Sequence, residues 1–464
     1  MEDQLQLGLL RWLRGTVDDD DGGEEDERGE NGLDLVRILE RVLQDDGHQN
    51  FVHDDRLTQI LHEIIVHEGR NNQDDLVNAL IGVLGVQPEE DEDHLRDLFA
   101  NLIAAENREQ ILQARKMADR DTKVMRQFLR LISRPFHMNE LQFRRLYRLT
   151  PEAAMVLVEL LGPALMHNSR TKIPVDLQVL IILRFLGYAD YQRSISQDYK
   201  HPVCQSLVSY IIGRGIDALC DLMDTFIIFP RNHQERFETQ ERFRRTISIP
   251  GILGIVDGFL VRLRRPSQHE EAFYNYREGH CVNVQLVCDA RGIIIGLRVC
   301  PGSNNDMFNW EFSATREHME NLRANPGVLA QEGRYYMLGD NGYNPSLVLL
   351  TPIENAPEGS PEAQYTAEVC QTRSLVERTI GSLSGTWRCV NRGRKLCYSS
   401  EKVAKMVMAS AVLHNFSKFH GHLADGFAPG QVAHDNGRVV YALNDNYHAG
   451  IMERNNIVNM YYAQ

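Results

Sequence analysis

The chain has 464 residues, enough for two or three domains, and its 43% hydrophobic and 25% charged residues are ordinary for a globular protein. It holds no run of about 18 apolar residues and no basic, apolar leader, so we expect neither a membrane span nor a secretory signal. The eight cysteines lack CxxC spacing, which favours buried reduced thiols in an intracellular protein over a zinc site or a disulfide framework.

The net charge of −14 is unevenly distributed along the chain. Residues 1–121 hold 31 acidic and 12 basic side chains, a balance of −19, whereas the remaining residues hold 33 acidic and 38 basic ones, a balance of +5. Residues 123–250 alone hold 18 basic and 12 acidic side chains. Such a basic body suits contacts with phosphate, which supply most non-specific affinity for DNA.

Residues 1–121 form the first predicted domain, an acidic helical head. Residues 16–32 are an acidic linker with nothing to bury, which predicts disorder. Apolar residues at helical spacing predict short helices between residues 33 and 118. Two interpretations stay open: a small helical domain with charged loops, or a segment that docks a partner or competes with DNA for the basic body.

Residues 122–250 form the second predicted region, which is again helical. One helix begins at Thr150, a capping residue, with Pro151 at its first position. The following segment predicts a helix that stops at Gly187, a short helix, a turn, and a longer helix near residues 204–218. This rhythm is typical of a helix-turn-helix, whose last helix would enter the major groove, but an ordinary helical bundle explains it equally well.

Residues 251–420 form the third predicted domain, where the pattern changes to short strands. An apolar strand ends at Asp257, two strands flank a turn at residues 289–292, and a later short strand ends in a turn at Asp340. Helical stretches are expected at residues 307–325, 370–386 and about 400–420. Residues 421–464 are a predicted C-terminal tail. This order of elements predicts a mixed α/β fold, a sheet flanked by helices.

Three acids stand at or near the ends of predicted elements. Asp257 closes the first strand, Asp340 follows the later strand, and Glu377 lies on a predicted helix. Adjacent central strands could bring the two aspartates together, and a helix packed across the sheet could present Glu377. Hydrolysis of a phosphodiester needs a water nucleophile and neutralised phosphate charge, which two Mg²⁺ or Mn²⁺ ions held by carboxylates can supply. Spacing alone leaves plain turns and a solvated helix pair as alternatives for these acids.

Seven short motifs occur in order along the chain: GILGIVDGFLVRLRRP, NYREGHCVNVQLVCDARG, PGSNNDMFNW, YYMLGDNGY, LLTP, RSLVERTIGSLSGTWRCV and LHNF. Together they resemble the PIF/Harbinger transposase superfamily, and most closely the domesticated, transposase-derived nucleases of animals. The resemblance covers roughly residues 125–420 and does not include the acidic head.

The resemblance implies a ribonuclease-H-like DDE nuclease domain that needs a divalent metal cation, Mg²⁺ or Mn²⁺. Asp257 matches the first acid of the family, Asp340 the second and Glu377 the third. Each would be a catalytic residue and a metal ligand, and together they would position and activate water. Asp306 is a candidate helper in the outer shell of the metal.

Basic side chains on or near the predicted nuclease elements are candidates for contacts with DNA, although solvated surface positions are an alternative reading. They are Arg262, Arg264, Arg265, Arg277, His280, Arg388, Arg392, Arg394 and Lys395. Trp387 is expected in the core. His414 and Asn415 are expected to pack or cap a helix rather than to bind a metal.

Two functions follow as hypotheses. The first is a metal-dependent endonuclease derived from a Harbinger transposase, or a still-mobile transposase, that hydrolyses DNA by direct attack of water. The second is a catalytically silent DNA- or chromatin-binding scaffold with the same fold. Two departures from the family favour the scaffold somewhat, as does the acidic head: Phe259-Leu260 stand where many relatives have Thr-His, and Asn305 stands where many have His. The three retained acids argue against it.

The resemblance also implies partners and a location. Besides DNA, relatives are expected to work with a separate Myb-like DNA-binding protein, which supplies site recognition and nuclear import, and no segment here looks Myb-like. We expect the protein in the nucleus, with the cytoplasm as a further location. A homo-oligomer is compatible with the sequence.

Overall fold

The structure is a computed structural model that describes residues 111–113, 116–118, 120–130, 134–166, 173–198, 200–391, 393–420 and 445–463. The chain divides into two units, Met1–Met125 and Arg126–Gln464, and the fold described below belongs to the second. Of the predicted acidic head, only parts of residues 111–121 are described, and these are helical. The other predicted helices of the head and the linker 16–32 lie outside the described residues.

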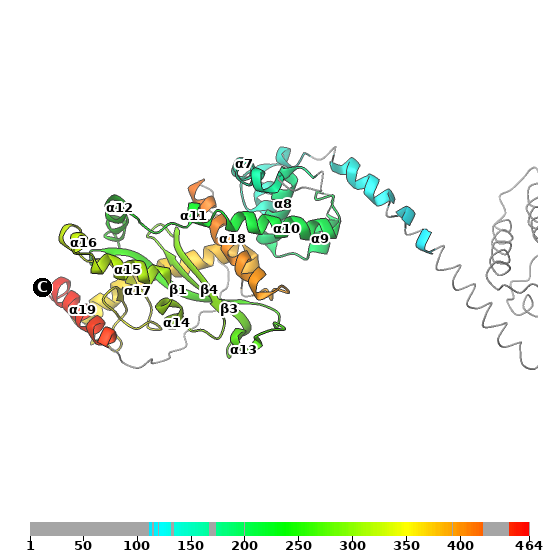
Figure 1. Cartoon of the computed structure of the whole chain (residues 1–464). Coiled ribbons are helices and arrows are strands. Elements are labelled where there is room, and N and C mark those ends of the chain that lie inside the picture. The colour runs from blue at the N-terminus through cyan, green and yellow to red at the C-terminus, as the bar shows by residue number, and fades with distance from the viewer. Residues whose placement is uncertain are drawn as a thin grey trace, which may run out of the picture. The chain divides into compact units, whose positions relative to one another are not determined.

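A mixed sheet of six strands lies in the second unit (Figure 1). The strands are β1 (Ile252–Arg262), β2 (Tyr274–Asn275), β3 (Gly279–Cys288), β4 (Ile294–Pro301), β5 (Tyr336–Leu338) and β6 (Leu349–Leu350). β3 pairs antiparallel with β1, β2 and β4, whereas β5 pairs in parallel with both β1 and β6. β1 is therefore the strand at which the antiparallel and parallel halves of the sheet meet.

β1 is buried from Ile252 to Val261, because strands flank it on both edges and helices cover both faces. A strand buried in this way reads as a nearly continuous apolar run, as GILGIV does. The prediction that the strand ends at Asp257 is wrong: β1 continues through Asp257, in register with β3, to Arg262. The pairing with β3 decides where β1 ends, and local sequence does not show that pairing.

Helices surround the sheet, and two of the predicted helices have different bounds from those expected. The surrounding helices are α12 (His233–Phe243), α13 (Glu270–Phe273), α14 (Asp306–Glu311), α15 (Ala314–Ala324), α16 (Pro326–Gln331), α17 (Pro361–Thr386), η2 (Arg388–Val390), α18 (Ser400–Phe419) and α19 (Asp445–Tyr461). The single helix predicted over residues 307–325 is two helices, because Ser313 caps α15 by accepting a hydrogen bond from the Arg316 backbone. α17 begins before residue 370, because Ser360 caps it and Pro361 occupies its first turn.

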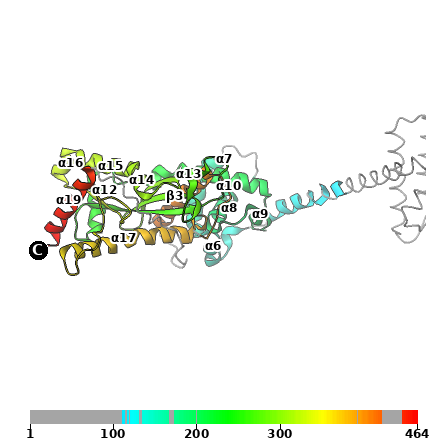
Figure 2. The same cartoon turned by 90° about the horizontal axis from the view of Figure 1, so that it is seen from below.

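The two faces of the sheet pack against different helices (Figures 1 and 2). Ile255 and Phe259 of β1 belong to the large core that includes buried residues of α17 and α18. Val256 belongs to a second core that includes Trp310 of α14 and Met319 of α15. Neighbouring residues of a strand point to opposite faces, so the sheet separates two helical layers.

A helical bundle precedes the sheet. Its helices are η1 (Pro135–His137), α6 (Glu140–Tyr147), α7 (Pro151–Met166), α8 (Val175–Tyr188), α9 (Gln192–Gln197), α10 (Gln205–Cys220) and α11 (Met223–Phe226). The predicted succession of a helix, a short helix and a longer helix is confirmed as α8, α9 and α10. α10 contacts α7, α8, α9 and α18, and buries Val208, Ile211, Ile212 and Ile216 at helical spacing. This packing supports the bundle interpretation, and a helix-turn-helix function stays a prediction.

Gly187 does not stop α8, contrary to the prediction. The helix continues to Tyr188, and Ala189 ends it in a left-handed conformation with a φ of 53°. A Cβ at Gly187 would overlap the side chain of Arg148, which also donates a hydrogen bond to the Gly187 carbonyl at 3.3 Å. The glycine therefore permits the Arg148 side chain to lie close against α8.

α6 and α7 bury much of their apolar surface inside the bundle. Phe143, Tyr147, Leu157 and Leu161 belong to the large core. Within the part of the chain that the structure describes, no single helix is long and apolar enough to cross a membrane, and α6 with α7 meets that test only as a pair bent by 49°.

The predicted C-terminal tail contains α19, which packs near the parallel edge of the sheet. Its Glu453 is buried and accepts hydrogen bonds from Arg323 at 3.1 Å, Arg334 at 2.9 Å and the Tyr336 hydroxyl at 2.5 Å. The helix also contributes apolar side chains to the large core. Residues 421–444 lie outside the described residues.

The eight cysteines are all free thiols. The prediction of buried thiols is confirmed for Cys281, Cys288, Cys300 and Cys389. It is wrong for Cys204, Cys370 and Cys397, which are exposed, and Cys220 is half-buried. Burial of a single thiol depends on which face of its element it occupies, and scattered cysteines do not reveal that face.

Three residues in or near α18 pack as predicted. Trp387 is fully buried. The His414 Nε2 lies 3.1 Å from the Gly292 carbonyl oxygen, and the Asn415 amide bonds both the N–H and the C=O of Ile294. These contacts tie α18 to the start of β4.

The burial of His414 predicts a dependence of stability on pH. Burial lowers the pKa of His414 to about 4 in the folded state, against about 6.5 in the unfolded chain. Between these values the unfolded state binds a proton that the folded state excludes. The free energy of unfolding should therefore fall by about 3 kcal/mol as the pH falls from 6.5 to 4, with no such change above 6.5.

Chemical denaturation across this pH range, for the wild type and for His414→Asn, tests the prediction. The variant should be less stable at neutral pH, because it loses the contact with Gly292, but its stability should depend less steeply on pH. Equal slopes for the two proteins would contradict the prediction.

Candidate active site

Asp257 and Asp340 are brought together by the pairing of parallel strands. Ile255 of β1 pairs with Leu338 of β5, and each aspartate stands two residues further along its own segment. Asp257 is 2% exposed. Asp340 lies in the turn after β5, where its Oδ1 accepts a hydrogen bond from the Gly342 N–H at 2.9 Å. The two residues therefore stand at the same level of the sheet, Asp257 on β1 and Asp340 just beyond the adjacent strand β5.

Glu377 is linked to Asp257 through an arginine. Its side chain on α17 is 49% exposed and accepts a hydrogen bond from Arg373, one turn earlier, at 2.9 Å. The same Nη2 of Arg373 lies 3.8 Å from Asp257 Oδ2. α17 packs on β1 and buries Val376 and Ile380, so this row of α17 faces the strand. Arg373 therefore holds a positive charge between the first and third acids.

The acids do not form a ready metal cage. Among the residues that the structure describes, no three His, Cys, Asp or Glu side chains gather closely enough to hold a metal ion. The donor set nevertheless fits Mg²⁺ or Mn²⁺, because carboxylate oxygens are the hard ligands these ions prefer. The Nε of Arg373 is buried without a hydrogen-bond partner, so this arginine is only partly satisfied where it lies.

Asp306, the candidate helper, lies on the opposite face of β1. It is 4% exposed at the start of α14, and its Oδ1 accepts a hydrogen bond from the Asn283 amide at 3.0 Å. It occupies the space over Gly258, where a Cβ would overlap its carboxylate. Because Asp257 and Gly258 are consecutive in the strand, Asp257 points away from this face.

The positions that depart from the family have packing and capping roles. Phe259 and Leu260 are fully buried. Asn305 is the N-cap of α14 and accepts a hydrogen bond from the Phe308 N–H at 2.8 Å. None of these side chains titrates, so none of them can transfer a proton beside Asp257.

Tyr343 belongs to the site, although sequence reasoning did not single it out. Burial raises the pKa of the Tyr343 hydroxyl well above its usual value, and the charges of Asp306, Asp257 and Asp340 raise that pKa further. The negative charges of all three aspartates therefore act on this one hydroxyl group. Its only signal in the sequence was its place in the turn after Asp340, and the signal for Arg373 was its spacing of four residues from Glu377.

The candidate DNA contacts near β1 are partly neutralised. Arg265 forms an ion pair with Glu270, and His280 Nε2 lies 2.8 Å from a carboxylate oxygen of the same glutamate. Three further candidates are exposed or half-buried: Arg262, Arg264 and Arg277. A DNA phosphate would have to compete with Glu270 for Arg265 and His280.

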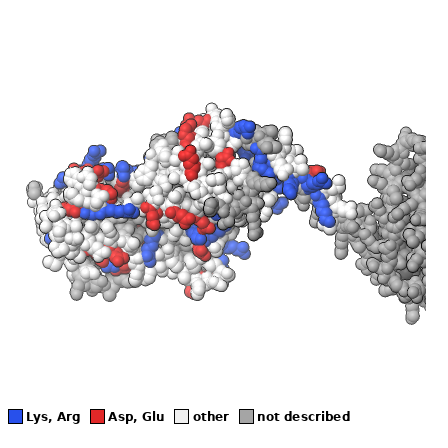
Figure 3. All heavy atoms as spheres, turned by 45° about the horizontal axis from the view of Figure 1, so that its top comes forward, with Lys and Arg blue, Asp and Glu red and all other residues white. Residues whose placement is uncertain are grey.

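The second group of candidate DNA contacts follows α17. Its described members are Arg388, Arg394 and Lys395, while Arg392 lies outside the described residues. A β-bridge between Leu263 and Leu396 lays this segment beside the end of β1. The two basic groups are thus neighbours. On the face drawn in Figure 3, the basic and acidic side chains of the described residues are interspersed and do not form one basic surface.

Comparison with known proteins assigns this arrangement to a class. Residues 256–415, which hold all three acids, match the family described as DDE superfamily endonuclease. The mixed sheet and the three acids on and beside it therefore belong to a DDE-type endonuclease domain.

Curated relatives that match about half of the chain narrow the class to a family. The chain is 30% identical over 269 residues to "Putative nuclease HARBI1" of Xenopus laevis, which covers 57% of this chain and 74% of that protein. It is 28% identical to the human protein of the same name with the same coverage, and 22% identical over 249 residues to "Protein ALP1-like" of Arabidopsis thaliana, at 51% and 59% coverage. The chain belongs to the PIF/Harbinger family of DDE transposases and transposase-derived nucleases. No solved structure matches it.

Proposed function

We propose that the protein is a divalent-metal-dependent endonuclease that hydrolyses phosphodiester bonds of DNA. The observation that carries this proposal is the placement of Asp257 and Asp340 on adjacent parallel segments, with Glu377 tied to Asp257 through Arg373. The membership of the PIF/Harbinger family and the name of the HARBI1 relatives support it.

The three acids would hold the metal, Mg²⁺ or Mn²⁺, and the metal would supply an activated water and neutralise charge on the phosphate. Arg373 neutralises Asp257 and Glu377 in the present arrangement and prevents the repulsion that clustered carboxylates would otherwise suffer. Tyr343 and Asp306 are both buried on the other side of β1, and their charge and packing set the environment of Asp257 and Asp340. Nearby basic side chains would bind the phosphates on either side of the cut.

The strand arrangement supports a ribonuclease-H-like assignment of this domain. β1 pairs antiparallel with β3 and β3 with β4, and β5 and β6 extend the sheet in parallel from the other edge of β1. The first acid then lies on the central strand and the second beyond the adjacent strand β5, the relation expected for the family.

A catalytically silent DNA- or chromatin-binding scaffold is a second candidate, and one observation favours it. The three carboxylates do not converge as a metal site, and Arg373 stands between two of them. In an enzyme, metal and DNA would displace Arg373. In a scaffold, the arginine would permanently replace the metal.

Cleavage of supercoiled plasmid by the purified protein decides between these candidates. We expect nicking with Mn²⁺ or Mg²⁺, none with EDTA, and none with Asp340→Asn, whose amide is a poorer metal ligand of the same shape. Absence of cleavage by the wild type, even with a Myb-like partner protein added, would favour the scaffold.

Further features of the proposal concern partners and location. We propose DNA as the substrate, a Myb-like protein as the partner that supplies site recognition, and the nucleus as the main location, with the cytoplasm as a further one. Self-association into a homo-oligomer is part of the same proposal.

The acidic head predicts a masking effect on DNA binding. Deletion of residues 1–121 removes a net charge of −19 and leaves a chain with a net charge of +5. We expect the truncated protein to bind non-specific DNA several-fold more tightly at low salt, with a steeper dependence on salt concentration. Titration of labelled duplex DNA over a salt series measures both. Identical binding curves for the two proteins would contradict masking.

A further inference from the structure

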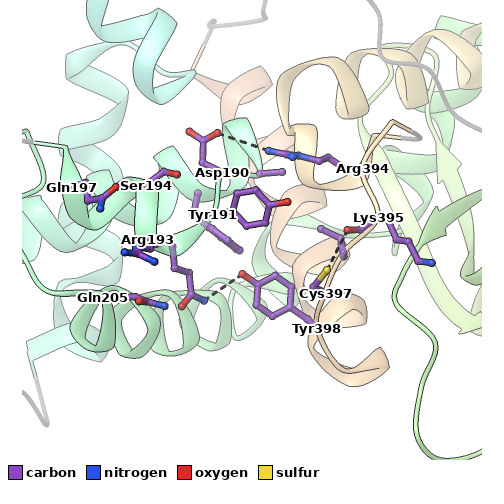
Figure 4. Close-up of a pocket in the computed structure, with 14 residues that line it drawn as sticks. Asp190, Tyr191, Arg193, Ser194, Gln197, Gln205, Arg394, Lys395, Cys397 and Tyr398 are labelled. Atoms are coloured by element: carbon purple, nitrogen blue, oxygen red, sulfur yellow. Dashed lines mark hydrogen bonds and ion pairs between the residues drawn. The ribbon is translucent and has the colours of Figure 1, made fainter.

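A cavity of about 470 Å³ lies between the helical bundle and the segment that leads into α18 (Figure 4). α8, α9 and the start of α10 form one side of it, and residues 394–398 form the other. None of the candidate metal ligands lines it. It is therefore distinct from the candidate active site.

The cavity carries more positive than negative charge. Arg193 lies on the helical side and Arg394 on the other, while the Lys395 side chain points away from the two tyrosines, and Asp190 is the one carboxylate among the described residues that line the cavity. Asp190 is already engaged by Arg184 at 3.2 Å, and Arg394 lies 3.8 Å from its other oxygen. The net positive charge favours an anionic ligand such as a phosphate.

Two tyrosines give the cavity aromatic surface. Tyr398 is held in place, because its hydroxyl accepts a hydrogen bond from Gln192 at 3.3 Å and its ring packs edge-on against Phe185. Tyr191 is 71% exposed, and the Arg394 guanidinium carbon lies 5.8 Å from the centre of its ring. An exposed ring beside a cation is the combination on which single-stranded nucleic acid stacks its bases.

Polar side chains complete the wall. Gln197 and Gln205 offer amides and Ser194 offers a hydroxyl, all of which can donate and accept hydrogen bonds at the edge of a base. In a duplex the faces of the bases are stacked on one another and their pairing edges are occupied. An unpaired base leaves both its face and its edge open, so it suits this lining.

The cavity is connected to the candidate active site through the backbone. Leu396 lines the cavity and forms the β-bridge with Leu263, just beyond the end of β1. Along β1, the distance from Asp257 to Arg262 is roughly 17 Å at the usual rise of a strand. A DNA strand that contacts the acids could therefore reach the cavity within several nucleotides.

We propose that this cavity binds an unpaired nucleotide of DNA, with its base stacked on Tyr191 and its phosphate held by Arg394. The proposal rests on the proposed function, because its ligand is a segment of the DNA that the acids would cut. It adds a second site, which holds a single-stranded end or a melted base while the acids act on the backbone nearby.

Fluorescence anisotropy with the full-length protein in EDTA tests the proposal without cleavage. The probes are a labelled duplex and the same duplex with a short single-stranded tail. The tail should increase affinity, and Tyr191→Ala should weaken binding of the tailed probe by roughly 5- to 100-fold while leaving duplex binding unchanged. Tyr191→Phe keeps the ring and should behave as wild type.

Tyr210→Ala is the matched control. Tyr210 is 41% exposed on α10 with the Arg214 guanidinium 5.7 Å from its ring, but it does not line the cavity, so its loss should have no effect on the tail. A tail that adds no affinity, or equal weakening of both probes by Tyr191→Ala, would overturn the proposal. Binding that depends on the tail without plasmid cleavage under metal would instead refute only the nuclease, and no binding to either probe would refute both.

Discussion

Asp257→Asn is expected to reduce metal-dependent DNA cleavage on the order of 10⁴-fold, the size of loss seen when one member of a catalytic set is removed. Asp257 is buried on the central strand, and its backbone pairing with Leu286 of β3 sets its position. The amide has the same shape as the carboxylate, so the strand should keep its register while the site loses one negative metal ligand. Plasmid cleavage at saturating Mn²⁺ measures the effect.

The other acids provide matched comparisons for this result. Glu377→Gln should cause a loss of similar size if Glu377 is a metal ligand, because it also loses one charge. Asp306→Asn should reduce cleavage only about 10- to 100-fold. Asp306 lies on the face of β1 opposite Asp257, so it acts on the site through neighbouring residues and not as a metal ligand. A loss for Asp306→Asn as large as that for Asp257→Asn, with an active Glu377→Gln variant, would show that the third ligand is misassigned.

Glu453→Gln is expected to lower the free energy of unfolding by about 3 kcal/mol, because removal of one partner from a buried ion pair leaves the other charge without compensation. Burial disfavours the charge of Glu453, but hydrogen bonds from Arg323 and Tyr336 outweigh burial and keep its pKa below the usual value. The glutamine would leave Arg323 and Arg334 facing each other around a neutral group. Urea denaturation near neutral pH, monitored by fluorescence, measures the change.

An exposed ion pair is the control for this prediction. Glu401→Gln removes a carboxylate that is 81% exposed and 3.6 Å from Lys405, and it should change the free energy of unfolding by less than about 1 kcal/mol. Tyr336→Phe removes only one hydrogen bond to Glu453 and should cost about 1 kcal/mol. Equal stability of Glu453→Gln and the wild type would show that α19 is not anchored through this carboxylate.

Local patterns in the sequence predicted several elements well. The apolar runs on either side of the turn near residue 290 predicted β3 and β4, and helical spacing predicted α8, α10 and α18. These signals work because a buried face must be apolar with the period of its own element. Element ends were less predictable: β1 extends beyond Asp257, and α17 begins at Pro361.

The sequence by itself determined the family, because seven motifs in a set order identify it, and it determined which acids are candidates for the metal. Tertiary structure alone decided where those acids lie relative to one another. The parallel pairing of β1 with β5 sets Asp257 beside Asp340, although 83 residues separate them in the chain, and α17 introduces Arg373 between Asp257 and Glu377. The placement of Asp306 across the strand and of Tyr343 among the aspartates came from the same packing. Pairing between distant strands and packing of a helix on a sheet depend on non-local contacts, which no window of the sequence contains.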